Sequence, residues 1–162
     1  MSMTTSAPAG PASADAAAEV DAAERDGGNG VIAFPQGLPG FPGATRFALR
    51  PLAGAANELL VLQSADDPDL RFLVLPYAGE WMPLRRLDLD QACEALGVRA
   101  EDAAVLLVVT RGQEPGSDGT ARQRLYVNLR APVVLDMVRR TAVQHVLASP
   151  SYPVRHCLAA AA

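Results

Sequence analysis

The segment Arg124–Met137 constrains the fold most, because it alternates apolar and polar residues on both sides of a single proline. In residues 125–130 the odd-numbered positions are apolar and the even-numbered positions are polar, as a strand with one buried face requires. Pro132 has no N–H to give to a sheet, so it belongs at an edge, at a bulge or at the start of a new strand. Alternation then resumes, with Met137 predicted on the apolar face and Asp136 opposite. We therefore predict two strands with a bend at Pro132.

The composition fits one globular domain without a general attraction for nucleic acid. The chain has 162 residues, of which 49% are hydrophobic, and this is enough for one core. Its net charge of −4 comes from residues 1–30, which hold five acids and one arginine, whereas the charges of residues 31–162 balance. A neutral domain lacks the basic surface that a phosphate backbone attracts, so we predict no direct binding of nucleic acid.

Residues 1–30 are predicted to be a disordered acidic leader. They are rich in Ala, Gly and acids and contain no aromatic residue, so they cannot bury enough surface to offset the entropy of ordering. The folded domain is predicted over residues 31–158, with a short alanine tail at 159–162. The leader has no signal-peptide pattern, and the strongest apolar run, Ala103–Val109, is too short to span a bilayer. We therefore expect a cytoplasmic protein without membrane contacts.

Regularly spaced apolar segments predict a mainly β fold, namely a small antiparallel barrel-like domain with one short helix. Besides the two strands that flank Pro132, strands are expected at 31–34, 45–52, 58–63, 70–75, 104–110 and 142–147. Residues 111–120 are predicted to form a long polar hairpin loop, and the segment that contains Trp81 is predicted to be irregular. The helix is expected to begin at Asp88, with Gln91 completing a capping box, and to end at Gly97.

Two connections are of interest for binding. Residues 35–43 hold three prolines and three glycines around two large apolar side chains, Leu38 and Phe41. These side chains either plug one end of the core or are presented to a partner. The turn at residues 64–69 carries Asp66, Asp67 and Asp69. Clustered carboxylates can bind a metal ion, but this turn lacks the ligand spacing of a calcium loop, so capping of the turn is the simpler interpretation.

No catalytic or metal-binding motif is visible. The two cysteines are far apart, and Cys93 lies on the apolar stripe of the predicted helix, where it is expected to be buried. His156 and Cys157 are neighbours, but neighbours in a strand point to opposite faces and do not readily share a proton. His145 is expected in a strand. We predict no catalytic residue, no metal and no cofactor, which favours protein binding and leaves a small-molecule-binding or catalytic barrel as the alternative.

Four segments together resemble the FliW family of flagellar assembly factors. In chain order they are Phe34–Phe41 (FPQGLPGF), Leu62–Phe72 (LQSADDPDLRF), Asn128–Val134 (NLRAPVV) and Tyr152–His156 (YPVRH). The resemblance covers residues 31–158. The acidic leader has no recognised counterpart, and the arginine-rich turn at Arg139 and Arg140 is individual to this chain.

The resemblance implies a small, mostly β protein that is not an enzyme. Members of the family bind flagellin in the cytoplasm, and they also bind the translational regulator CsrA, whose binding to RNA they antagonise. Export of flagellin frees the factor, which then removes CsrA from flagellin mRNA. A barrel with a partner-facing rim could do this without any chemistry of its own.

The residues predicted to contact partners come from three segments. They are Leu38, Phe41, Asp66, Asp67, Asp69, Tyr126, Asn128 and Arg130. The last three are chosen because they face away from the apolar side of their predicted strand. The acidic turn is expected to contact CsrA, because CsrA-type proteins carry basic surfaces.

Overall fold

The computed structural model describes residues 30–54, 58–77, 79 and 83–158. The predicted leader, the alanine tail and Trp81 lie outside these residues. The described elements are β1 (Val31–Ala33), β2 (Arg46–Pro51), β3 (Leu60–Ser64), β4 (Arg71–Pro76), α2 (Arg86–Leu96), the 3-10 turn η1 (Ala100–Asp102), β5 (Ala103–Pro115), β6 (Ala121–Val127), β7 (Val133–Asp136), β8 (Thr141–Gln144) and β9 (His156–Cys157). The protein is therefore mainly β with one short α-helix in the described part, as the sequence predicts.

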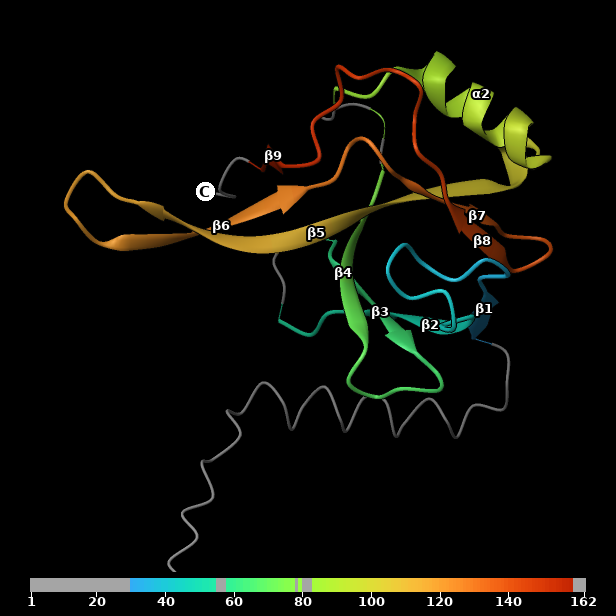
Figure 1. The fold of residues 1–162 in the computed structure, drawn as a ribbon, viewed down its shortest axis with the longest axis horizontal. Helices are drawn as coiled ribbons and strands as arrows, with labels where there is room; N and C mark the ends of the chain where they lie inside the picture. Colours follow the sequence, from blue (N-terminus) through green and yellow to red (C-terminus); the bar gives the residue numbers. More distant parts are fainter. Residues whose placement is uncertain (1–29, 55–57, 78, 80–82, 159–162) are drawn as a thin grey trace, which may run out of the picture. The chain divides into compact units, whose positions relative to one another are not determined.

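The strands form a ring (Figure 1). The sheet order is β4-β3-β2-β1-β8-β7-β5-β6-β9, and an additional pairing of β4 with β5 closes the first seven strands on themselves. Only β1 and β8 are parallel among the paired strands of the described residues, where Ala33 lies opposite Thr141. Closure leaves these strands without long unpaired edges inside the ring.

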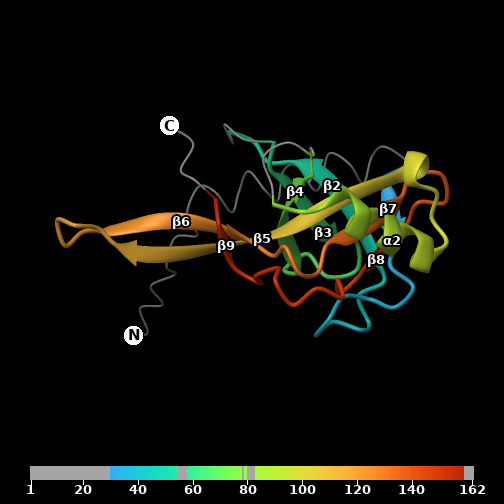
Figure 2. The ribbon, with the colours of Figure 1, turned by 90° about the horizontal axis from the view of Figure 1, so that it is seen from above.

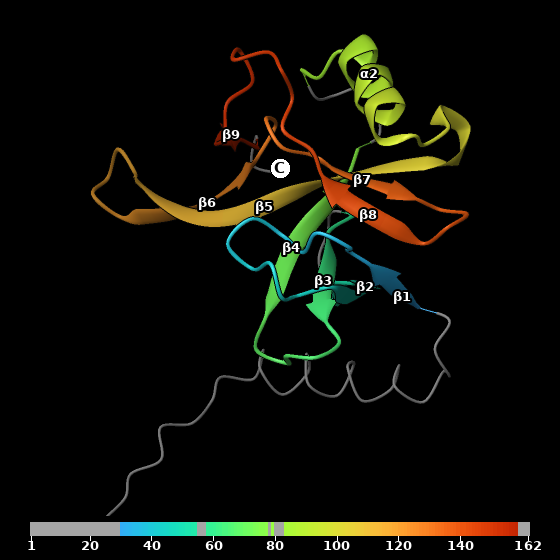
Figure 3. The ribbon, with the colours of Figure 1, turned by 45° about the vertical axis from the view of Figure 1, so that its right-hand side comes forward.

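The first half of strand β5, residues 103–109, is covered on both faces, because it separates two apolar clusters. Its residue Leu106 belongs to the inner cluster, to which each of the seven ring strands contributes. The next residue, Leu107, belongs to an outer cluster that includes α2 and the chain beyond β8. Figures 1 and 3 show α2 and the C-terminal segment on the side of β5 that faces away from β2 and β3. This arrangement explains why both faces of β5 are apolar in the sequence.

The predicted bend at Pro132 is confirmed, because β6 and β7 pair one after the other with the same strand. β6 lies along residues 109–115 of β5, and β7 lies along residues 103–106. Between them, the Asn128 side-chain carbonyl accepts the backbone N–H groups of Arg130 at 3.0 Å and Ala131 at 3.1 Å. Residues 128–130 therefore leave the strand in a capped turn and do not continue its alternation.

The prediction of a loop over residues 111–120 is wrong for its first half. β5 continues to Pro115 and pairs with β6 from Ala121, so only residues 116–120 form the turn. The N–H of Gly116 donates to the carbonyl of Thr120 at 2.7 Å. This two-stranded ribbon extends past the ring (Figures 1 and 2). Its side chains are largely solvated, so the pattern of one buried face that reveals most strands is missing from the sequence.

Helix α2 ends as predicted but begins differently. Gly97 adopts the left-handed conformation with φ 68° and terminates the helix, and Cys93 is buried. The predicted capping box is wrong, because the helix begins at Arg86 and its N-cap residue, Arg85, makes no side-chain cap. Instead, the hydroxyl of Tyr152 accepts the N–H of Arg85 at 3.2 Å and donates to the carboxylate of Asp88. The cap of this helix is supplied by a distant part of the chain.

The role of Asn128 can be tested by changing its side-chain acceptor. In Asn128→Ala, two backbone N–H groups lose their partner, so we expect the free energy of unfolding to fall by about 1–3 kcal/mol in urea titrations. Asn128→Asp keeps an acceptor oxygen and is the matched control, with a smaller expected loss. Equal losses in the two variants would show that the acceptor is not what stabilises the turn.

Candidate partner-binding surface

Two of the three segments predicted to contact partners leave the ring at the same end. β1 and β3 both run antiparallel to β2, so the β1–β2 loop and the β3–β4 turn lie at the same end of their strands. The link from β6 into β7 lies instead against the C-terminal segment, because the N–H of Leu129 donates to the carbonyl of Pro153 at 3.1 Å. We call the end with residues 35–43 and 65–70 the loop end of the ring.

The proline- and glycine-rich loop divides its two large side chains between the core and the solvent. A pair of backbone hydrogen bonds joins Leu38 and Phe41, with N–H to O distances of 3.2 and 2.7 Å. Leu38 is buried in the inner cluster, whereas Phe41 is 42% exposed and its ring lies edge-on to Phe72 at a centroid distance of 5.6 Å. The loop therefore both plugs the core and presents an aromatic side chain. Leu38 is not available to a partner, which corrects the prediction for that residue.

Close backbone approach fixes the shape of this loop. Gly37 has φ +66°, and a Cβ atom there would lie 2.5 Å from the carbonyl oxygen of Phe41. Only glycine fits such a position without a shift of the backbone. The exposed ring of Phe41 is therefore held by a short, stiff connection, which reduces the entropy that a partner would have to remove on binding.

Hydrogen bonds from the side chains of Gln63 and Ser64 fix the backbone of the acidic turn. The Gln63 amide nitrogen is buried and lies 3.1–3.3 Å from the carbonyl oxygens of four residues, Ser64, Asp67, Pro68 and Leu70. The Ser64 hydroxyl accepts the N–H groups of Asp66 and Asp67 at 3.3 and 3.1 Å. These two polar residues were missed in the sequence analysis, because a Gln–Ser pair after an apolar strand carries no specific signal.

The three carboxylates of this turn are exposed. Asp67 accepts the N–H of Asp69 at 3.0 Å, which agrees with the predicted capping role. Asp66 forms an ion pair with Arg46 at 3.2 Å, with both side chains more than half exposed, so this pair contributes little stability. The turn therefore presents a net negative surface beside the Phe41 loop, because Phe72, which contacts Phe41, follows this turn at the start of β4.

Tyr126 is the buried member of a polar cluster at the base of the ribbon, in which Glu114 is half-buried and Arg155 is exposed. Its hydroxyl donates to Glu114 at 2.7 Å, and the guanidinium of Arg155 lies 4.3 Å from the centroid of its ring. The hydrogen bond to Glu114 and burial raise the pKa of Tyr126. At Gly112 on β5, a Cβ atom would lie 2.6 Å from the tyrosine ring. This close packing uses Tyr126 for structure, contrary to its predicted place on an exposed face.

Of the eight predicted residues, six keep a side chain at or near the surface. Phe41 and the three aspartates are exposed, and Asn128 and Arg130 are half-buried. Leu38 and Tyr126 are buried, and the side-chain oxygen of Asn128 caps the turn into β7. Contact of the six residues with a partner stays a prediction.

The potentially reactive side chains are dispersed. In the described ranges, no group of three or more His, Cys, Asp or Glu side chains is placed to hold a metal ion. His145 follows β8 and donates its backbone N–H to Pro132 at 2.9 Å, whereas His156 lies in β9 opposite Val127. Burial and the nearby Asp90 carboxylate raise the pKa of the Cys93 thiol, so it is protonated at neutral pH and is a weak nucleophile.

A pocket of about 420 Å³ lies between α2 and the strands β4 and β5. It is lined by backbone and side chains that include Tyr77, Arg86, Asp90 and Cys93, and neither histidine lines it. The guanidinium of Arg86 is paired with Asp90 at 3.3 Å. Among the described helices, none has the length and apolar character that crossing a membrane requires.

Comparison with known proteins assigns the chain to a family. The family model described as "FliW protein" matches residues 15–158, which begins within the segment predicted to be a leader. The chain belongs to the FliW family. A relative named "Flagellar assembly factor FliW" from Anoxybacillus flavithermus is 32% identical over 130 residues, covering 79% of this chain and 83% of the relative. A FliW of the same name from Geobacillus sp. is 31% identical over 141 residues, covering 86% and 88%.

The fold of the FliW family is also found in a solved structure. A crystal structure of the flagellar assembly factor FliW matches with a TM-score of 0.58 and 24% identity, covering 80% of this chain and 86% of the other. The mainly β ring, with one α-helix in the part of the chain that the structure describes, is therefore the family's fold, and the resemblance inferred from the four sequence segments is confirmed.

The support of the acidic turn by Gln63 can be tested with an isosteric change. Gln63→Glu places a carboxylate oxygen against carbonyl oxygens, so we expect a loss of about 2–4 kcal/mol in the free energy of unfolding at neutral pH. Gln113→Glu makes the same chemical change on the exposed ribbon and should stay within about 0.5 kcal/mol of the unchanged protein. Similar effects of the two substitutions would contradict the role assigned to Gln63.

Proposed function

We propose that this protein is a flagellar assembly factor that binds flagellin and antagonises CsrA in the cytoplasm, and so couples flagellin synthesis to export. The observation that carries the proposal is membership of the FliW family over most of the chain, together with relatives named as flagellar assembly factors. The role requires protein binding and no chemical step, so the protein is not an enzyme in this proposal.

The loop end of the ring is the surface that fits protein binding best. It combines an exposed aromatic ring on a stiff loop with a turn that carries three carboxylates. Aromatic side chains supply much of the binding energy at protein interfaces, and charges at the rim steer the approach of a partner. A basic partner such as CsrA would meet the acidic turn, while Phe41 would supply the apolar contact.

Regulation by such a factor requires coupling between its partners. Binding of flagellin must disfavour binding of CsrA, and binding of CsrA must lower the affinity of CsrA for RNA. A coupling free energy of about 1–3 kcal/mol changes an affinity by roughly 5–150-fold, which is sufficient for a switch. Overlap of two partners on one end of the ring would produce the first of these effects by steric exclusion alone.

A small-molecule-binding or catalytic domain is the second candidate. The pocket beside α2 has room for a small ligand. Its lining includes a thiol with a raised pKa and an arginine already paired with Asp90, so it offers little for catalysis. Density for a soaked ligand in this pocket, against Tyr77, Arg86 or Cys93, would favour this candidate, whereas a pocket that stays empty after soaking would count against it.

The proposed function is tested by mixing the purified protein with flagellin and CsrA from the same bacterium and measuring heat by titration calorimetry. We expect binding to both, and we expect Phe41→Ala to weaken at least one complex by about tenfold or more. Leu87→Ala removes an apolar side chain that is 54% exposed on α2, and it is the matched control. The proposal fails if the unchanged protein binds neither flagellin nor CsrA.

A further inference from the structure

The turn between β7 and β8, residues 137–140, exposes two consecutive large apolar side chains. Met137 is 58% exposed and Val138 is 72% exposed, the highest value among the large hydrophobic residues of the described chain. The sequence predicts Met137 on the apolar face of its strand, but β7 ends at Asp136 and the chain turns away. Single exposed apolar residues are common on protein surfaces, whereas adjacent ones on one turn indicate a contact site.

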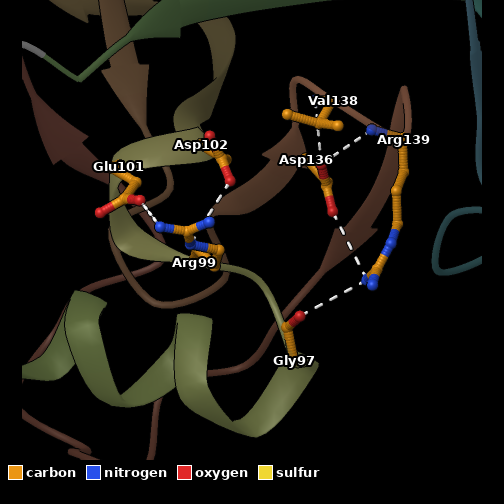
Figure 4. A network of polar contacts seen from close by, with 7 residues as sticks. All are labelled: Gly97, Arg99, Glu101, Asp102, Asp136, Val138 and Arg139. Carbon is orange, nitrogen blue, oxygen red and sulfur yellow. Dashed lines mark hydrogen bonds and ion pairs between the residues drawn. The ribbon is translucent and has the colours of Figure 1, made fainter.

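The turn is rigid, because its backbone is fixed by neighbouring side chains and carbonyls. The buried carboxylate of Asp136 accepts the N–H groups of Val138 at 3.0 Å and Arg139 at 2.9 Å (Figure 4). The N–H of Met137 donates to the carbonyl of Asp102 at 2.9 Å. The two apolar side chains are therefore presented on a preorganised backbone, which lowers the entropic cost of binding.

The charged side chains around this turn balance, because Arg99, Arg139 and Arg140 lie with Glu101, Asp102 and Asp136. Figure 4 shows Arg139 against Asp136, at 3.7 Å, and against the carbonyl of Gly97, at 3.5 Å. The neighbouring carboxylates of Glu101 and Asp102 are both paired with Arg99.

Arg140 differs from these arginines. It donates to the backbone carbonyl of Val31 at 3.5 Å, but it forms no ion pair with a carboxylate in the described part of the chain. The backbone of Arg140 has φ 54°, in the left-handed region, and this conformation closes the turn. A carboxylate of a binding partner could therefore pair with the Arg140 guanidinium next to the apolar side chains of Met137 and Val138.

We propose that residues 137–140 form a second docking element, for a polypeptide surface that combines an apolar pocket with neighbouring carboxylates. The N–H of Ala33 donates to the carbonyl of Arg140 at 2.9 Å, so this turn lies beside the end of β1 from which the Phe41 loop starts. Figures 1 and 3 show the β7–β8 turn well separated from the β3–β4 turn. The β3–β4 turn carries three carboxylates near Phe41, whereas this turn carries Arg140 beside Met137 and Val138.

This inference rests on the proposed function for the choice of probe. CsrA is expected to offer a basic surface, which fits the acidic turn and does not fit Arg140. Flagellin is therefore the probe for the β7–β8 turn. The variant is Met137→Ser combined with Val138→Ser, and Arg140→Gln tests the charge separately. The matched control combines Val146→Ser and Val154→Ser, which are 59% and 57% exposed and lie outside this turn.

We expect the double variant in the turn to weaken flagellin binding about tenfold or more, and Arg140→Gln to weaken it by roughly threefold to tenfold. CsrA binding should stay within about twofold in both, and the control should leave both affinities unchanged. Because all the substituted side chains except Arg140 are more than half exposed, thermal unfolding should be little affected.

Four outcomes would overturn the inference. Unchanged flagellin binding by the variants, while the unchanged protein binds flagellin, would refute the inference and leave the proposed function intact. If the variants lose binding to CsrA and keep binding to flagellin, the turn contacts CsrA and the inference is wrong about the partner. Concentration-dependent dimers in sedimentation velocity that the double variant abolishes would identify a second copy of this chain as the occupant. If the unchanged protein binds neither partner, the proposed function fails and the inference falls with it.

Discussion

The burial of β5 on both faces is the constraint on which the rest of the structure depends. One face of this strand completes the inner cluster of the ring, and the other supports the cluster beneath α2 and the C-terminal segment. A strand covered on both sides needs partners along both edges, and β5 has β4 on one edge and β7 followed by β6 on the other. Ring closure, the position of α2 and the path of the C-terminal segment all follow from this single strand.

Polar side chains fix the connections around this apolar framework. Gln63 satisfies carbonyls of the acidic turn, Asn128 caps the link into β7, and Asp136 caps the turn into β8. Tyr152 performs the same task for the start of α2. In each case a buried or half-buried side chain satisfies backbone groups that the strands and the helix leave unpaired. The connections are therefore as well defined as the strands, which is what a surface for recognising other proteins requires.

Partner recognition by such a molecule depends on exposed side chains that a fixed backbone holds in place, and it requires no chemical reaction. Phe41 in the β1–β2 loop and Met137 with Val138 in the β7–β8 turn are held out from the core by backbones that glycine and aspartate fix in place. The β3–β4 turn carries three carboxylates, whereas the β7–β8 turn carries Arg140, which has no acidic partner in the described residues. A regulator that must distinguish partners by charge, and hold each by an apolar contact, needs little more than this.

The sequence by itself determined the mainly β class, the bend at Pro132 and the end of the helix at Gly97, because alternation, proline and left-handed glycine act locally. It also determined membership of the FliW family, through four matching segments. Tertiary structure decided which of the marked residues face solvent. The alternation pattern predicts that Tyr126 faces solvent, but the C-terminal segment covers it. The same pattern predicts that Met137 faces the core, but the hydrogen bonds to the Asp136 carboxylate turn the chain away. The ribbon at 111–115 was missed because solvated strands pair through their backbones and leave no periodic apolar pattern. Contacts between residues far apart in the chain have no local signature, and these contacts set the surface.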